Sequence, residues 1–216
     1  MKYIVDSLKG VKRKKNQDGY LILSNENISI FIVFDGLSSN EFSYIYINIF
    51  KEKIKKEFED NENFHQSISD ILFKIHLSLI NSGAKGYSTI SMIVYRKKMD
   101  IVEFLSIGDS RIYIFTSSYL ESITKDDNLS ERKNILTRYL GSPQLKREDF
   151  QLKKINSKCH FLICTDGFYS LMETELKEYF RIINLKYLKN ILNGLKRLQT
   201  TFNSDDSTYI LIKNEI

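Results

Sequence analysis

The order of the hydrophobic patterns constrains the fold of this 216-residue chain more than any other feature of its sequence. Short runs that are rich in Ile, Val, Phe and Tyr and bounded by Gly, Asn, Asp or Ser predict strands. The predicted strands are Lys2–Leu8, Tyr20–Ser24, Ile28–Phe34, Ser88–Tyr95, Ile101–Ile107, Arg111–Phe115, Phe150–Ile155, Phe161–Cys164 and Thr208–Ile212. Apolar residues at helical spacing predict helices over residues 42–58, 64–79 and 185–198.

Two consecutive helices thus separate the first strands from a second block of strands, and the third helix precedes the last strand. This order differs from the strict alternation of strand and helix that builds a doubly wound parallel sheet. It favours an α+β fold in which helices cover mainly antiparallel sheets. The chain has one proline and no Pro-rich or Gly/Ser-rich linker, so residues 1–216 are expected to form a single domain.

The cysteines and the apolar runs indicate a compartment. Cys159 and Cys164 lie five positions apart in an apparent strand, so their side chains should point to opposite faces and form no disulfide. That suits a reducing cytosol. The N-terminus meets a charge too early for a signal peptide, and the apolar runs are too short to cross a bilayer. We therefore expect a cytoplasmic chain with no membrane partner.

The net charge of +5 raises the question of nucleic-acid binding. The 32 basic residues are, however, scattered among 27 acidic ones, apart from one dense cluster at residues 12–15. No RNA-binding motif or zinc-finger spacing accompanies this cluster, which reads as a solvated loop. No nucleic-acid partner is expected.

Aspartates stand at the ends of several predicted strands. Three strands end in Asp35-Gly36, Gly108-Asp109 and Asp166-Gly167, whereas Asp18 and Asp205 stand just before two others. Each Asp-Gly pair alone is ordinary turn chemistry. If the strand ends converge, the carboxylates would repel one another unless cations neutralise them, and oxygen ligands suit Mg²⁺ or Mn²⁺.

Histidine chemistry is an unpromising alternative. The three histidines show no paired ligand spacing, which argues against zinc, and His65 and His76 are expected on helix surfaces or edges. Neither cysteine is followed six positions later by an arginine, as a cysteine phosphatase requires, and no Walker-type loop is present.

Seven motifs in sequence order resemble those of the type 2C serine/threonine protein phosphatases, a metal-dependent family, and in particular its compact bacterial members. The motifs are Arg13-Lys14-Lys15-Asn16-Gln17-Asp18, Phe31-Ile32-Val33-Phe34-Asp35-Gly36, Gly86-Tyr87-Ser88-Thr89, Gly108-Asp109-Ser110-Arg111, Leu136-Thr137-Arg138-Tyr139-Leu140-Gly141, Thr165-Asp166-Gly167 and Asp205-Asp206-Ser207-Thr208. The resemblance implies a four-layer α-β-β-α sandwich. It also implies an enzyme that hydrolyses phosphoserine and phosphothreonine with a metal-activated water.

The resemblance assigns roles to individual residues. Asp35 would bridge two Mn²⁺ or Mg²⁺ ions, and the Gly36 carbonyl would help to hold one of them. Asp166 and Asp205 would complete the first site, and Asp18 would serve the second through water. Asp109 would bind a weaker third ion. Arg13 would grip the substrate phosphate, so Arg13, Asp35 and Asp166 are the implied catalytic residues.

Departures from the family pattern leave an alternative open. Ser38-Ser39 follow Asp35-Gly36 where the family usually has a glycine pair, and the segment between Phe115 and Leu136 is shorter than the usual flap. The alternative is a catalytically weak or inactive phosphatase-like module that binds a phosphoprotein partner. For the active enzyme, the resemblance implies a monomer whose phosphoprotein substrate is made by a serine/threonine kinase.

Overall fold

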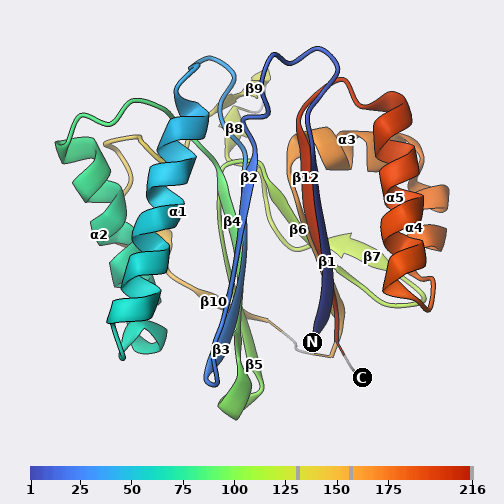
Figure 1. Ribbon diagram of the computed structural model, residues 1–216, viewed down its shortest axis with the longest axis horizontal. Coiled ribbons are helices and arrows are strands. Elements are labelled where there is room, and N and C mark those ends of the chain that lie inside the picture. The colour runs from blue at the N-terminus through green and yellow to red at the C-terminus, as the bar shows by residue number, and fades with distance from the viewer. Residues whose placement is uncertain (130–131, 156–157, 215–216) are drawn as a thin grey trace.

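The computed structural model describes residues 1–129, 132–155 and 158–214, which form four layers (Figure 1). The strands are β1 Lys2–Leu8, β2 Gly19–Ser24, β3 Ile28–Phe34, β4 Ile90–Arg96, β5 Ile101–Ile107, β6 Arg111–Phe115, β7 Leu120–Ser122, β8 Asn128–Leu129, β9 Arg132–Leu136, β10 Lys153–Ile155, β11 His160–Cys164 and β12 Ser207–Lys213. The α-helices are α1 Ser43–Asp60, α2 Ile68–Asn81, α3 Asp166–Thr174, α4 Leu176–Ile183 and α5 Leu188–Phe202. Short 3₁₀ helices are η1 Phe64–Gln66, η2 Lys97–Met99 and η3 Arg147–Phe150.

Two antiparallel five-stranded sheets form the middle of the molecule. Their strand orders are β1-β12-β11-β6-β7 and β10-β5-β4-β3-β2. Helices α1 and α2 cover the second sheet, and α3, α4 and α5 cover the first (Figure 1). The predicted α+β class and the four-layer arrangement are confirmed. The segment that the sequence predicts to be a shortened flap contains the two-stranded ladder of β8 and β9.

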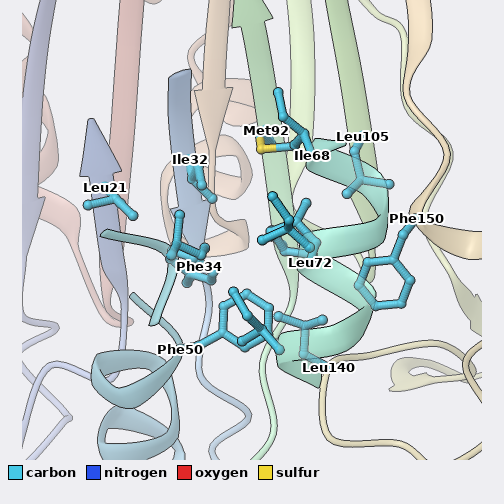
Figure 2. Close-up of a cluster of buried hydrophobic side chains, with 14 of the residues drawn as sticks. Leu21, Ile32, Phe34, Phe50, Ile68, Leu72, Met92, Leu105, Leu140 and Phe150 are labelled. Atoms are coloured by element: carbon cyan, nitrogen blue, oxygen red, sulfur yellow. The ribbon is translucent and has the colours of Figure 1, made fainter. Parts of the chain in front are cut away.

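Both faces of the central strand β3 are buried, and all of its residues except Ser29 are apolar. In β3, Ile30 and Ile32 face the helices, whereas the alternating Phe31 and Val33 face the other sheet. Figure 2 shows part of the helix-covered core, with Phe34 of β3 and Phe50 of α1 close together. Since every residue of β3 is buried, this strand gives the site at its end a rigid support.

Two expectations for local structure are wrong. The predicted strand Phe150–Ile155 is only Lys153–Ile155, because Phe150 ends a 3₁₀ turn and packs in the helix-covered core. His76 does not lie at a helix surface but is fully buried on α2, where the Phe73 ring stacks on it and the Phe150 ring lies tilted beside it. Helices α3 and α4 were not expected at all, although Phe168, Met172 and Tyr179 on them are buried at nearly helical spacing.

The cysteine prediction is confirmed. Cys159 packs between the two sheets and Cys164 packs against the α3–α5 layer, and neither is bridged. Among the described residues, the helices are too short or too polar to span a membrane.

Candidate functional site

The predicted strand ends meet at one end of the sandwich, opposite the chain termini in Figure 1. Strands β3, β5 and β11 end there, and β2, β6 and β12 begin there. A pocket of about 310 Å³ opens between them. Its lining includes every residue predicted for the site, namely Arg13, Asp18, Asp35, Gly36, Asp109, Asp166 and Asp205. Gln17, Leu37, Ser38, Ser39, Thr89, Leu136 and Asp206 complete it.

The glycines of Asp35-Gly36 and Asp166-Gly167 serve close packing rather than a turn. Neither Gly36 nor Gly167 has a positive φ angle. A Cβ on Gly36 would lie 2.5 Å from the carbonyl oxygen of Gln17, and one on Gly167 would overlap the carbonyl oxygen of Asp206. Each glycine therefore lets a neighbouring segment approach the aspartate that precedes it. Asp166 begins helix α3, so β11 runs into a helix at this point.

The carboxyl groups at the floor of the pocket are desolvated and repel one another. Asp18 and Asp35 are partly exposed to the pocket, yet the surrounding protein desolvates them and raises the pKa of each well above its usual range. The Asp35 and Asp166 carboxyl groups lie within hydrogen-bonding reach of each other, which requires a shared proton or a cation. Burial raises the pKa of Asp109 to about 7, and Asp166 adds to the shift.

Hydroxyl groups hold the aspartates, and the sequence interpretation did not include them. Thr165 Oγ1 donates to Asp18 Oδ2 at 2.8 Å and accepts from the backbone N–H of Thr208 at 2.9 Å. The N–H of Asp35 donates to Thr89 Oγ1 at 3.1 Å. All three threonines belong to the quoted motifs, and that membership was the available signal, although only Thr165 directly adjoins an aspartate in the sequence.

Arg13 and Asp205 are paired with each other. Arg13 Nε and Nη2 donate to the two carboxylate oxygens of Asp205 at 2.5 and 2.6 Å. This hydrogen bonding raises the pKa of Arg13. Both side chains remain about one third exposed. In this arrangement the guanidinium and the carboxylate satisfy each other, so neither is free for a second partner on the same atoms.

Asp206, the second residue of the Asp205-Asp206-Ser207-Thr208 motif, anchors the loop between β1 and β2. Its two oxygens accept the backbone N–H groups of Gly10 at 3.0 Å and Gln17 at 2.8 Å. An asparagine could accept only one of these bonds, because its amide nitrogen is a donor. Burial raises the pKa of Asp206, and the two N–H groups oppose that shift.

The flap is fixed to the turn that carries Asp109. Asp127 accepts the N–H of Gly108 at 3.0 Å and pairs with Arg138 at 3.0 Å. Arg111 forms two hydrogen bonds with Asp126, at 2.8 and 2.9 Å, and lies 3.8 Å from the centre of the Tyr169 ring. We refer to Asp126, Asp127 and Arg138 as the flap base.

The donor set suits hard divalent cations because the pocket gathers several carboxylates and no imidazole or thiol. Within the described part of the chain, no three His, Cys, Asp or Glu side chains already stand so that they could jointly hold a metal ion. The Arg13–Asp205 ion pair occupies both oxygens of one of these carboxylates. The residues fit the ions chemically once that pair opens.

Known proteins of similar sequence and structure identify the class. A family model described as Protein phosphatase 2C matches residues 11–197. A Mycoplasma genitalium protein named "Putative protein phosphatase" is 28% identical over 253 residues, covering 96% of this chain and 93% of that protein. The serine/threonine phosphatase Stp1 from Staphylococcus aureus has a TM-score of 0.80 at 18% identity, covering 99% of this chain and 95% of that one.

A third similar structure is the catalytic domain of the serine/threonine protein phosphatase PstP in complex with 2 manganese ions. Its TM-score is 0.75 at 15% identity, and the match covers 97% of this chain and 96% of that one. The sandwich fold and the matched family together define the chain as a protein phosphatase. Because the family match spans most of its length, the chain belongs to the protein phosphatase 2C family.

Proposed function

We propose that this chain is a serine/threonine protein phosphatase that depends on two Mn²⁺ or Mg²⁺ ions, with a weaker third. The single observation that carries the proposal is the meeting of Asp18, Asp35 and Asp166 at the floor of one pocket, where desolvation raises the pKa of each carboxyl group. Such a cluster is costly without cations. The two manganese ions named for the PstP structure support the same stoichiometry.

The proposed ligands follow the arrangement of the pocket. Asp35 would lie between the two ions with the Gly36 carbonyl beside it, Asp166 and Asp205 would serve one ion, and Asp18 would serve the other. When bound, the cations would lower the pKa of a water molecule and withdraw charge from the phosphoryl oxygens. Asp109 would hold the third ion.

Arg13 is the proposed phosphate-binding residue. Its planar guanidinium can donate two parallel hydrogen bonds to a phosphate, as it now does to Asp205. Asp205 accepts only two of the five N–H donors of this guanidinium, so a phosphate would bind on the Nη1 side or replace the carboxylate. Thr165 and Thr208 would keep Asp18 oriented throughout, through the hydrogen bonds described above.

The experiment is hydrolysis of a phosphothreonine peptide by wild type and Asp166→Asn, with Mn²⁺, Mg²⁺ or a chelator. We expect turnover that needs a cation and is lost in the variant, while the circular dichroism spectrum stays unchanged. Turnover that survives in the chelator or in Asp166→Asn would contradict the metal assignment.

The second candidate function is a phosphoprotein-binding module without turnover. One observation favours it: the Arg13–Asp205 ion pair occupies both a proposed ligand and the proposed phosphate-binding group. Measuring both binding and hydrolysis of a phosphopeptide under saturating Mn²⁺ distinguishes the module from the enzyme. Binding without hydrolysis in wild type would support the module and contradict the enzyme.

A further inference from the structure

The loop between β1 and β2 presents a dense group of cations at the edge of the pocket. Of the seven residues 9–15, five are Lys or Arg and none is acidic. Arg13 lines the pocket, and its neighbours Lys12 and Lys14 are exposed. Neither lysine lines the pocket itself, but consecutive Cα atoms are about 3.8 Å apart, so the backbone of each lysine adjoins that of a pocket-lining residue. We refer to residues 9–15 as the basic loop.

The basic loop is held in place at several points. Asp206 accepts the N–H of Gly10, and Val11 donates its own N–H to the carbonyl of Asn203 at 3.2 Å. Lys9 Nζ donates to the Arg13 carbonyl at 2.8 Å, and Lys15 Nζ lies 3.0 Å from the centre of the Tyr44 ring. Because the loop is fixed in this way, its backbone has little conformational entropy left to lose on binding.

Two of the cations are available to a partner. Lys12 and Lys14 have no hydrogen-bond or ion-pair partner in the described part of the chain, whereas Lys9, Arg13 and Lys15 each have one contact named above. The pocket itself is lined by six aspartates, so its interior does not attract an acidic ligand. Positive charge at the rim supplies the attraction that the interior lacks.

We infer that the basic loop docks acidic residues flanking the phosphorylated residue of the substrate, with Lys12 and Lys14 as the specificity-determining side chains. The inference rests on the proposed phosphatase function. A nucleic acid is a poorer match, because the basic loop contains no aromatic residue on which a base could stack.

The test compares two phosphothreonine peptides of equal length, one with Glu and one with Gln around the phosphothreonine. With Mn²⁺ and low salt, we expect kcat/KM to favour the Glu peptide by about tenfold, from two exposed ion pairs. This preference should shrink at 0.5 M NaCl, where screening is strong. In Lys12→Glu/Lys14→Glu it should disappear or reverse.

The matched control is Lys177→Glu/Lys189→Glu, which makes the same change in charge at exposed positions of α4 and α5. It should keep the preference of wild type. Equal kcat/KM for the two peptides in wild type, or a preference that both double variants lose equally, would overturn the inference.

Binding separates this inference from the proposed catalysis. Fluorescence anisotropy of the two labelled peptides should show the same preference even if neither peptide is hydrolysed, in which case docking stands and the phosphatase proposal fails. A single-stranded RNA oligonucleotide serves as competitor. Displacement of the Glu peptide by RNA at a lower concentration than by unlabelled Glu peptide would overturn the assignment of the partner.

Discussion

Two regions of this molecule concentrate aspartates and treat their charge in opposite ways. At the flap base, Asp126 is paired with Arg111, and Asp127 with Arg138. In the pocket, Asp18, Asp35 and Asp166 lie together and are held by hydroxyl and backbone groups, with no arginine on any of them among the described residues. The first region is complete without a ligand, and the second is not.

The difference shows which aspartates carry stability and which carry function. A carboxylate paired with arginine strengthens the fold, whereas carboxylates that repel one another weaken it until cations arrive. Asp205 belongs to both groups, because it lines the pocket and yet is paired with Arg13. Four substitutions test this comparison, and they follow in order of expected effect.

Asp35→Asn should have the largest effect. We expect phosphopeptide turnover to fall by at least roughly a thousandfold, since the variant removes the proposed bridging ligand. In a chelator, the free energy of unfolding should rise by about 1 kcal/mol, because one desolvated charge is lost from the cluster. A phosphopeptide assay measures the turnover, and urea denaturation with and without Mn²⁺ measures the free energy of unfolding. A variant that is less stable than wild type in the chelator would show that the pocket is not under repulsion.

Arg13→Ala comes next. Removing the guanidinium should raise KM for a phosphopeptide by about tenfold, through loss of two charge-assisted hydrogen bonds. It should also tighten Mn²⁺ binding by about threefold, because Asp205 is released. Calorimetric titration of Mn²⁺ measures the second effect without any turnover. Weaker Mn²⁺ binding in the variant would mean that the ion pair does not compete with the cation.

Asp127→Ala tests the other region. The variant leaves Arg138 with fewer partners and the N–H of Gly108 without its acceptor, so the free energy of unfolding should fall by about 1–2 kcal/mol after allowance for the exposure of Arg138. The loss should be equal in chelator and in Mn²⁺. Asp70→Ala, which breaks an exposed ion pair with Arg147, is the control and should cost less. A loss that Mn²⁺ reverses would place Asp127 in the metal site.

His76 gives the smallest effect, on the pH dependence of stability. Burial lowers its pKa from 6.5, so the unfolded chain binds a proton that the folded chain excludes. The stabilisation is present above pH about 6.5 and is lost as the pH falls through the lower pKa of the folded state. In His76→Gln, the free energy of unfolding should change less between pH 7.5 and 5.5 than it does in wild type. The difference should be smaller than the roughly 1 kcal/mol of a typical substitution. His65→Gln, at a partly exposed position, is the control for the substitution itself.

The sequence by itself determined the main elements and the positions of the aspartates. An apolar run such as Ile28–Phe34 has to be buried on both faces, and an aspartate directly after it has to lie at the edge of the sheet. The order of the elements then excluded a parallel sheet. These properties are local or periodic, so they can be read without knowing which strands become neighbours.

Only the tertiary structure decided which partner each charge meets. Arg13 and Asp205 are 192 positions apart, and whether that arginine meets a carboxylate or a phosphate depends on how β1 and β12 pair. His76 illustrates the same limit, because its burial comes from Phe150, which a 3₁₀ turn far along the chain places against α2. Contacts of this kind depend on chain segments that only folding brings together, and no local pattern encodes them.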